Sequence, residues 1–287
     1  MKTINTYLSL LLVGGLLLTS CAEEPKRTSD TDGTEADSTM AEEGMLEDEE
    51  LSFMLPSPIQ IAAIFNRAGL KFQSNLTNPV SNLDNYVTKT AKYLNFGVYS
   101  ADLAYAVLND QQQLSIDYLN AVKTLADGIG MPSIFGTGDL INSFERNIGN
   151  QDTVLRILTV VKRRTDEYLE TNSESSKESI FFSAAWVEGM YLGANSGDDQ
   201  KITGRLLEQM TILDNIIIAL QVQNDESLEI DFLIDGLQGV HNAFESYESV
   251  KQLEQTNIDI SDVTLTEEEL ADLTKRINSL REQIITL

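Results

Sequence analysis

The chain has 287 residues, of which 42% are hydrophobic and 23% are charged, so it is long enough to bury a sizeable core and too apolar to be disordered throughout. Its 45 acidic and 20 basic side chains give a formal net charge of -25. This charge excludes a nucleic-acid partner, because phosphate binding needs a basic face. One cysteine and one histidine exclude a disulfide framework and leave a zinc, haem or iron–sulfur site without its usual ligands. We therefore expect no cofactor and no bound metal.

Residues 1–20 have the pattern of a signal peptide. Lys2 precedes an apolar run from Leu8 to Leu18, which is too short to cross a bilayer core of about 30 Å as a helix. The run ends in the tetrapeptide LTSC at residues 18–21, and this tetrapeptide resembles the lipobox of bacterial lipoproteins. The resemblance implies cleavage before Cys21 by signal peptidase II and a mature chain that acyl groups on Cys21 hold in a membrane.

Cys21 is the only cysteine of the chain. A plain secretory signal with an incidental thiol is the alternative, but an exported chain that forms no disulfide most simply uses this thiol for lipid. Ala22 stands where the inner-membrane retention signal of proteobacterial lipoproteins has Asp, so we expect an outer-membrane lipoprotein, on the periplasmic face or at the cell surface. The Glu23-Glu24 pair is similar to the acid-rich export signal of surface lipoproteins of Bacteroidota.

The segment after the cysteine is strongly acidic. Residues 22–50 hold twelve acidic side chains against Lys26 and Arg27, with no aromatic or β-branched aliphatic residue. Such a segment cannot bury enough surface to offset the entropy of ordering it, and its like charges repel one another. We therefore expect residues 21–50, with the lipidated cysteine, to form a disordered tether. The acidic residues are Glu23, Glu24, Asp30, Asp32, Glu35, Asp37, Glu42, Glu43, Glu47, Asp48, Glu49 and Glu50.

Residues 51–287 have a helical apolar pattern. All five prolines lie in the first half of the chain, so 155 residues follow the last of them without this break signal. Ser57 can cap a helix whose first position suits Pro58, and Gln60 completes a capping box. Gly69 ends that helix.

A stripe of apolar residues with a period of 3.6 runs from Leu83 to Leu108 and predicts one long helix or a close pair, with Gly97 as the candidate position of a bend. A second apolar pattern predicts a helix over 118–129, which stops before Pro132. A shorter helix is predicted over 140–148.

Capping signals at Asn150 and Ser175 mark the starts of two later helices. Asn150 precedes an apolar stripe over 154–168, and Ser175 with Glu178 forms a second capping box ahead of the apolar segment 180–191.

Towards the C-terminus, residues 206–220 and 233–247 alternate apolar steps of three and four, as the seams of a helical bundle do. Thr266 and Glu269 form the last capping box, before a stripe that continues to residue 287. Between them, residues 258–265 hint at strand alternation, but eight residues between two helices favour a loop.

These patterns predict an all-α fold, a multi-helix bundle of about eight to ten helices joined by short polar turns. A short α-solenoid of helix hairpins is the alternative, although the sequence shows no fixed period. The predicted organisation is a signal peptide at 1–20, a lipidated tether at 21–50 and a helical domain at 51–287.

Two carboxylates fall on apolar helix faces, where each needs a partner or a shifted pKa. Asp102 shares a face with a neighbouring tyrosine, and so does Glu188. With their aromatic neighbours they could line a ligand pocket, or serve as an acid/base pair if they converge. The alternative is that each carboxylate is paired inside the bundle and only fixes the packing. The candidate pocket residues are Tyr99, Asp102, Tyr105, Trp186, Glu188 and Tyr191.

No catalytic motif accompanies these residues. A di-iron bundle needs paired Glu-x-x-His segments, whereas the chain has only His241, and it contains no G-x-S-x-G sequence. We therefore expect a protein that is not an enzyme.

The segments 55–59, 97–102 and 186–188 make the body resemble an uncharacterised family of helical lipoproteins of Bacteroidota. That resemblance implies a cell-envelope location and no activity. The leading hypothesis is a lipid-anchored interaction or scaffold module with an envelope protein as partner. The alternatives are a bundle that binds a small ligand near Asp102 and Glu188, and an envelope hydrolase that uses these two carboxylates.

Overall fold

A computed structural model describes residues 55–136, 138–197, 199–223, 225–252 and 259–287. The chain divides into two units, Met1–Glu47 and Asp48–Leu287, and every described residue belongs to the second unit. The predicted signal peptide, Cys21 and the predicted tether up to residue 50 lie outside the described residues.

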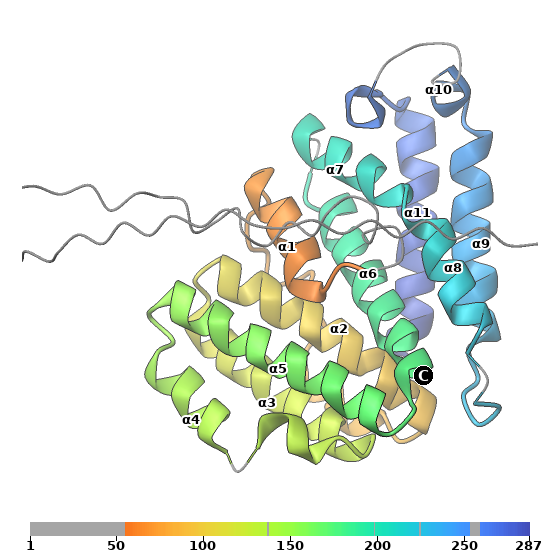
Figure 1. The fold of residues 1–287 in the computed structure, drawn as a ribbon. Helices are drawn as coiled ribbons and strands as arrows, with labels where there is room; N and C mark the ends of the chain where they lie inside the picture. The colour runs from red at the N-terminus through yellow and green to blue at the C-terminus, as the bar shows by residue number, and fades with distance from the viewer. Residues whose placement is uncertain (1–54, 137, 198, 224, 253–258) are drawn as a thin grey trace, which may run out of the picture. The chain divides into compact units, whose positions relative to one another are not determined.

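The described residues form eleven α-helices and no strand, which confirms the all-α bundle (Figure 1). The number exceeds ten because the predicted stripe over 206–220 forms two helices, α7 and α8, and because the four-residue helix α10 is added. The helices are α1 Pro58–Arg67, α2 Lys89–Leu108, α3 Gln112–Gly128, α4 Asp139–Arg146, α5 Gln151–Thr171, α6 Glu178–Ala194, α7 Gln200–Met210, α8 Leu213–Gln221, α9 Asp231–Ser246, α10 Glu248–Lys251 and α11 Glu267–Ile285. Short 3-10 turns are η2 Val80–Asn85, η3 Pro132–Phe135, η4 Ser175–Lys177 and η6 Ile260–Asp262.

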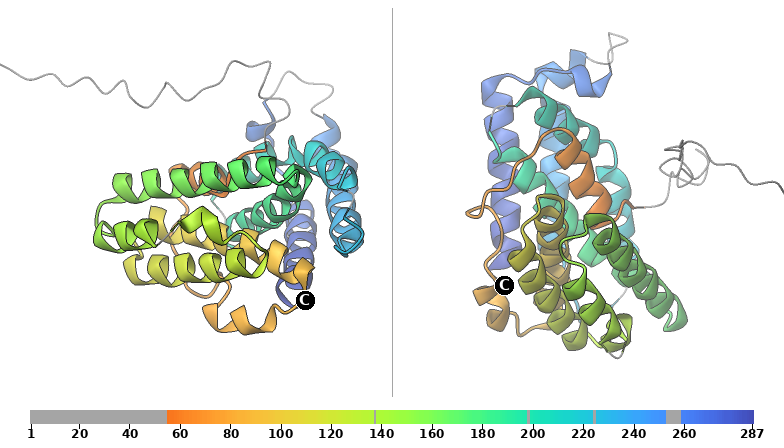
Figure 2. Two further views of the ribbon diagram at one scale, coloured as in Figure 1. Left: turned by 60° about the horizontal axis from the view of Figure 1, so that its bottom comes forward. Right: turned by 90° about the vertical axis from the view of Figure 1, so that its left-hand side faces the viewer.

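Helices α2 and α6 form the centre of this unit. In α6, 14 of 17 residues are buried, and a helix that is apolar on all sides has to be surrounded by other helices. Helices α1, α2, α7, α8 and α11 pack against it, and Figure 2 shows this arrangement from two further sides. A solenoid repeat contacts only its neighbours in the chain, so these contacts support the bundle rather than the solenoid.

Three of the predicted helix starts are confirmed. Ser57 and Thr266 each form the complete capping box, with Gln60 and Glu269 respectively. The Asn150 side chain accepts a hydrogen bond from the backbone N–H of Thr153 (2.9 Å). These caps are local, since each depends on residues within one turn, and the sequence alone therefore identifies them.

The capping box predicted for Ser175 and Glu178 is wrong. Ser175 begins the turn η4, and α6 starts at Glu178 without a side-chain cap. The Glu178 N–H bonds to the Ser175 carbonyl instead, so the backbone of the turn supplies the acceptor that a cap would supply.

Two predicted stripes are each divided between two elements. The stripe from residue 83 to 108 begins in η2, and α2 starts only at Lys89, after the N-cap Thr88. The stripe over 206–220 spans the end of α7 and the whole of α8, with the chain turning at Thr211 and Ile212.

Gly97 lies where α2 and α6 are in close contact. A Cβ atom at this position would lie 1.9 Å from the backbone oxygen of Phe181 on α6. The residue therefore allows α2 and α6 to approach closely, and no larger side chain would fit.

Candidate functional site

The structure places the six predicted pocket residues on the two central helices, with three on α2 and three on α6. Five of them are at most 2% exposed, and Tyr191 is half-buried. The helical periodicity therefore located buried positions correctly. What these side chains contact decides whether they form a site.

Glu188 forms a buried ion pair with Arg281 of α11. Arg281 donates from Nε to Glu188 Oε2 (2.8 Å) and from a terminal nitrogen to Oε1 (3.0 Å), the two-pronged geometry in which the two groups match best. The same terminal nitrogen donates to the backbone oxygen of Leu76 (3.2 Å). Glu188 is fully buried and Arg281 is 7% exposed, so loss of either partner would leave an uncompensated charge in the core.

Asp102 lies beside the Glu188–Arg281 pair, and its two carboxyl oxygens have different surroundings. Its Oδ2 accepts a hydrogen bond from the backbone N–H of Asn78 (3.0 Å), whereas its buried Oδ1 finds no donor among the described residues. Burial and the neighbouring charge of Glu188 raise the pKa of Asp102 well above its usual range. Burial also raises the pKa of Glu188, but Arg281 opposes that rise.

One guanidinium facing two carboxyl groups can neutralise only one of them. Burial and the neighbouring charge of Glu188 therefore favour the protonated form of Asp102, whose side chain interacts with that of Glu188. The cluster of Asp102, Glu188 and Arg281, hereafter the buried triad, carries no net charge when Asp102 is protonated.

The polar groups around the buried triad bind the irregular segment that joins α1 to η2. Tyr105 donates its hydroxyl hydrogen to the backbone oxygen of Lys71 (2.5 Å) and accepts from the backbone N–H of Gln73 (2.9 Å). Tyr99 donates to the backbone oxygen of Pro79 (2.9 Å). These hydrogen bonds satisfy backbone groups of an irregular segment, which would otherwise lack the partners that a helix or strand supplies, and they hold that segment against α2.

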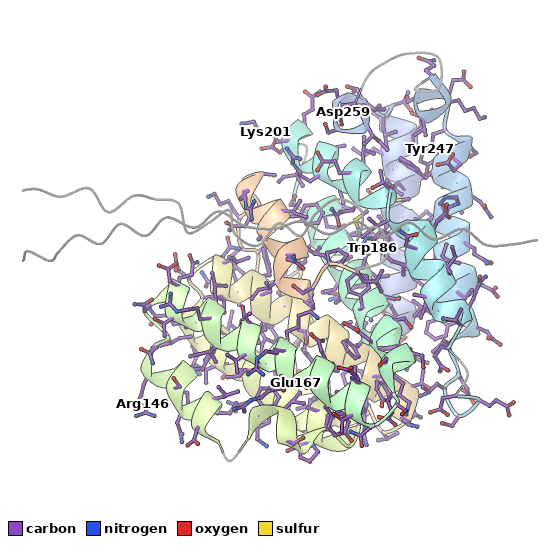
Figure 3. The ribbon with its side chains drawn as sticks, in the orientation of Figure 1. Arg146, Glu167, Trp186, Lys201, Tyr247 and Asp259 are labelled. Atoms are coloured by element: carbon purple, nitrogen blue, oxygen red, sulfur yellow. The ribbon has the colours of Figure 1, made fainter. Side chains whose placement is uncertain are left out.

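The remaining two candidates do not extend the cluster. Trp186 precedes Glu188 by two helical positions and lies in the middle of the bundle (Figure 3). It is 1% exposed, and its indole N–H has no hydrogen-bond partner among the described residues. The Tyr191 ring lies 4.2 Å from the Arg281 guanidinium carbon, a cation–π contact that helps to hold this arginine in place.

Two small depressions in the described residues have no lining from Asp102 or Glu188, and a ligand pocket at these carboxylates stays a prediction. One of them lies between α1, α2 and α6, has a volume of about 10 Å³ and is lined by apolar groups and by Tyr105 alone of the six candidates. Ligand pockets usually have about 300–1,000 Å³. This depression has room for about one water molecule.

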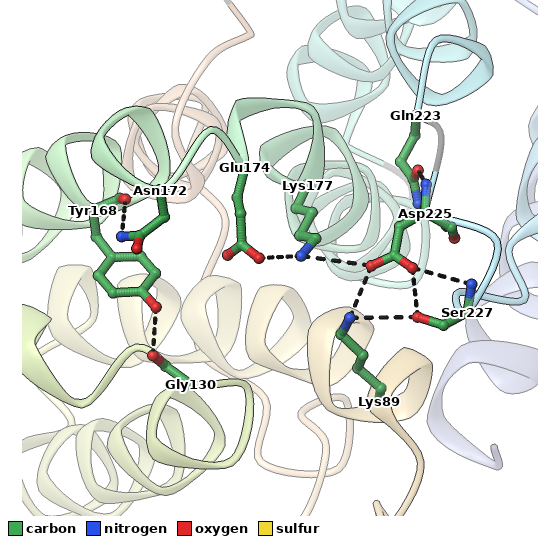
Figure 4. Close-up of polar contacts among 9 residues, drawn as sticks. All are labelled: Lys89, Gly130, Tyr168, Asn172, Glu174, Lys177, Gln223, Asp225 and Ser227. Atoms are coloured by element: carbon green, nitrogen blue, oxygen red, sulfur yellow. Dashed lines mark hydrogen bonds and ion pairs between the residues drawn. The ribbon is translucent and has the colours of Figure 1, made fainter.

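A second polar cluster ties three loops together (Figure 4). Lys89 at the start of α2 lies 2.8 Å from Asp225 Oδ2, and Lys177 of η4 lies 3.5 Å from the same oxygen. Lys177 also pairs with Glu174. A hydrogen bond from Lys89 holds the pKa of Asp225 well below its usual range. These ion pairs link the start of α2, the turn η4 and the loop after α8. The cluster therefore stabilises the loops at this end of α2.

Sequence reasoning missed Arg281 and Asn78, the two residues that complete the buried triad and its contact to the loop. Arg281 lies four residues after Ile277 and three before Ile284, both buried. This position on an apolar face is the signal that could have identified it as a partner for a buried acid. Asn78 lies in an irregular segment, where no periodicity marks burial.

Other candidate chemistry finds little support in the described part of the chain. His241 lies 3.1 Å from Asp214 and is partly exposed. Within the described ranges, no three His, Cys, Asp or Glu side chains gather as metal ligands would. None of the described helices combines the length and apolar character needed to cross a bilayer.

Comparisons with models of known protein families, with curated proteins and with solved structures find no match to this chain.

Proposed function

We propose that the protein is a lipid-anchored component of the bacterial cell envelope and acts as an interaction or scaffold module, without catalysis. The observation that carries this proposal is the LTSC tetrapeptide at residues 18–21, which follows an apolar run and contains the only cysteine. Several acyl chains on one residue give stable anchoring, because each buried methylene contributes about 0.8 kcal/mol.

The sequence after the cysteine favours the outer membrane, on its periplasmic face or at the cell surface. Ala22 does not match the retention signal of inner-membrane lipoproteins, and two acidic residues follow it. The 29 residues 22–50 could reach at most about 100 Å from the membrane when fully extended. An acidic tether of this length would let the folded unit meet a partner at a distance from the lipid surface.

The geometry of the buried triad supports a non-catalytic role. A general acid or base has to come within hydrogen-bonding distance of its substrate, directly or through one water molecule. Asp102 and Glu188 are both 0% exposed; Asp102 accepts a hydrogen bond from the backbone N–H of Asn78, and Glu188 accepts two from Arg281. The same contacts weigh against the ligand-binding and hydrolase alternatives.

The mass of the mature protein, purified from envelope membranes of a bacterial host, tests the proposal. We expect a chain that begins at Cys21 and carries acyl groups, and we expect Cys21→Ala to leave the signal peptide uncleaved and the acyl groups absent. Ser20→Ala is the matched control, because it keeps a small residue beside the cysteine and should preserve processing. An unmodified thiol on the wild-type chain would overturn the anchor.

Affinity capture after crosslinking in intact cells tests the interaction role. The anchored protein should recover envelope proteins that the Cys21→Ala form does not. Identical recovery by the two forms would contradict the role of the anchor.

A further inference from the structure

Two large exposed apolar residues lie at the C-terminal end of α8, with Ile218 inside the helix and Val222 at its C-cap. Ile218 is 57% exposed and Val222 is 67% exposed. The two are four residues apart, so they lie one above the other on the same face. Neither belongs to the hydrophobic core or packs against it. Helices α8 and α9 lie side by side at the right-hand edge of Figure 1 and again in the left view of Figure 2.

This apolar pair lies in an acidic part of the folded chain. Residues 206–250 contain nine acidic side chains and neither lysine nor arginine. Four exposed carboxylates follow α8 in its loop and in α9 and have no ion-pair partner in the described part of the chain. They are Glu226, Glu229, Asp231 and Asp235. A fifth, Asp214 on α8, is paired with His241 and is still 66% exposed.

We infer that the α8–α9 surface, made of Ile218, Val222 and these carboxylates, binds a basic amphipathic helix of a partner protein. Two apolar side chains one turn apart match the spacing of the apolar stripe on such a helix. Lysine and arginine side chains that flank this stripe would meet the carboxylates. This inference deepens the proposed interaction role and depends on it.

The negative charge of this surface favours a basic helix over a second copy of the chain and over an anionic membrane. A second copy of the chain would present the same acidic surface, and like charges brought together at an interface are unfavourable. An anionic membrane surface is repelled for the same reason. A basic helix gains from both the apolar and the electrostatic contribution, and the electrostatic part also speeds its association.

A fluorescein-labelled synthetic peptide of 18 residues tests the surface. It contains leucine on one helical face and lysine and alanine on the other, and a scrambled peptide of the same composition is its control. Binding to the full-length protein in phosphatidylcholine nanodiscs is measured by fluorescence anisotropy at physiological salt, with empty nanodiscs as blank. We expect the amphipathic peptide to bind more tightly than the scrambled one.

Matched variants separate the apolar contribution from the charge. Ile218→Ser with Val222→Ser keeps the charge and should weaken binding about tenfold or more. Leu287→Ser alters an exposed apolar residue outside this surface and should leave binding unchanged. Glu226→Gln, Glu229→Gln, Asp231→Asn and Asp235→Asn together should weaken binding and reduce its salt dependence.

Equal binding of the two peptides, or unchanged binding by the variant with serine at positions 218 and 222, would overturn the inference. A doubled molar mass without peptide that the same serine variant abolishes would assign the surface to a second copy and would also overturn it. Circular dichroism checks that each variant is folded. The mass spectrum of the same preparation reports lipidation separately, so failure of the anchor and failure of peptide binding are distinct results.

Discussion

The protonation state of Asp102 determines the net charge that is buried in this core. Asp102 and Glu188 share a single guanidinium, and no solvent reaches either carboxyl group. Because ionising both carboxyl groups would leave a net negative charge in the interior, the proton on Asp102 stabilises the fold. The same proton makes Asp102 a hydrogen-bond donor, which is the property that a buried carboxylate lacks.

This protonation predicts a stability that falls with rising pH. The pKa of Asp102 is raised in the folded state, so its contribution is fully present below the unfolded pKa of about 3.9 and is lost as the pH rises towards the folded pKa. Within that window the folding equilibrium constant should decrease about tenfold per pH unit, relative to a variant without this group.

Asp102→Asn is the appropriate variant, because an amide keeps one donor and one acceptor without a titrating proton. We expect it to fold and to lose this part of the pH dependence, while Asp102→Leu should cost about 1–3 kcal/mol by leaving buried groups unpaired. Urea unfolding between pH 4.5 and 8 measures both. Parallel pH curves for the wild type and Asp102→Asn would show that Asp102 is ionised.

The ion pair of Arg281 with Glu188 leads to a second prediction about the stability of the fold. Arg281→Met should destabilise the fold by about 3–5 kcal/mol, because Glu188 would be buried without a counter-charge. Adding Glu188→Gln should restore part of the loss, and this coupling is measured by a double-mutant cycle of unfolding free energies. Arg276→Met is the control, since Arg276 pairs with Asp272 at the surface and its loss should cost about 0–1 kcal/mol. Additive effects at residues 188 and 281 would contradict the pairing.

At the scale of helices, the contact between α2 and α6 depends on the absence of a side chain at Gly97. A Cβ there would meet the Phe181 backbone at 1.9 Å, and backbone atoms cannot move aside as a flexible side chain can. The Gly236 position differs, because its added Cβ would meet only the end of Leu280. The two central helices are therefore fixed to each other at one point of close approach.

Gly97→Ala should lower the free energy of unfolding by about 1–3 kcal/mol or more, as overpacking does. Gly239→Ala on α9 is the matched control, since its Cβ would meet no atom within 4 Å and a helical Gly-to-Ala change should stabilise by about 0.5–1 kcal/mol. Thermal and urea unfolding of both variants check these opposite signs. A neutral Gly97→Ala would mean that α2 and α6 are further apart than the structure shows.

At the scale of the whole molecule, negative charge is unevenly distributed. Residues 55–197 hold 14 acidic and 11 basic side chains, whereas residues 198–287 hold 19 and 6. Within residues 55–287, the excess therefore lies in the segment that contains α7 to α11. Such an excess keeps a protein soluble and destabilises its compact state by self-repulsion.

Salt should therefore stabilise the fold. Raising the NaCl concentration from about 20 to about 300 mM shortens the screening length from about 20 to about 6 Å, and we expect the Tm to rise by a few degrees. The variant with four neutralised carboxylates at residues 226, 229, 231 and 235 should respond less. Differential scanning calorimetry provides the measurement, and a Tm that falls with salt would show that attractive ion pairs outweigh the repulsion.

The sequence by itself determined the helical class, the caps at Ser57, Asn150 and Thr266, and the burial of Asp102 and Glu188. Each of these depends on residues within one or two turns of the same helix, where periodicity and capping chemistry act. It did not separate η2 from α2, because the apolar period continues across a change of backbone conformation.

Only the tertiary structure decided what the two buried carboxylates contact. Arg281 lies 93 residues after Glu188 in the sequence, and Asn78 lies 24 residues before Asp102. No local pattern relates residues so far apart. Their meeting follows from the packing of α11 and of the loop after α1 against the central helices, which gives each buried carboxylate a partner from a distant part of the chain.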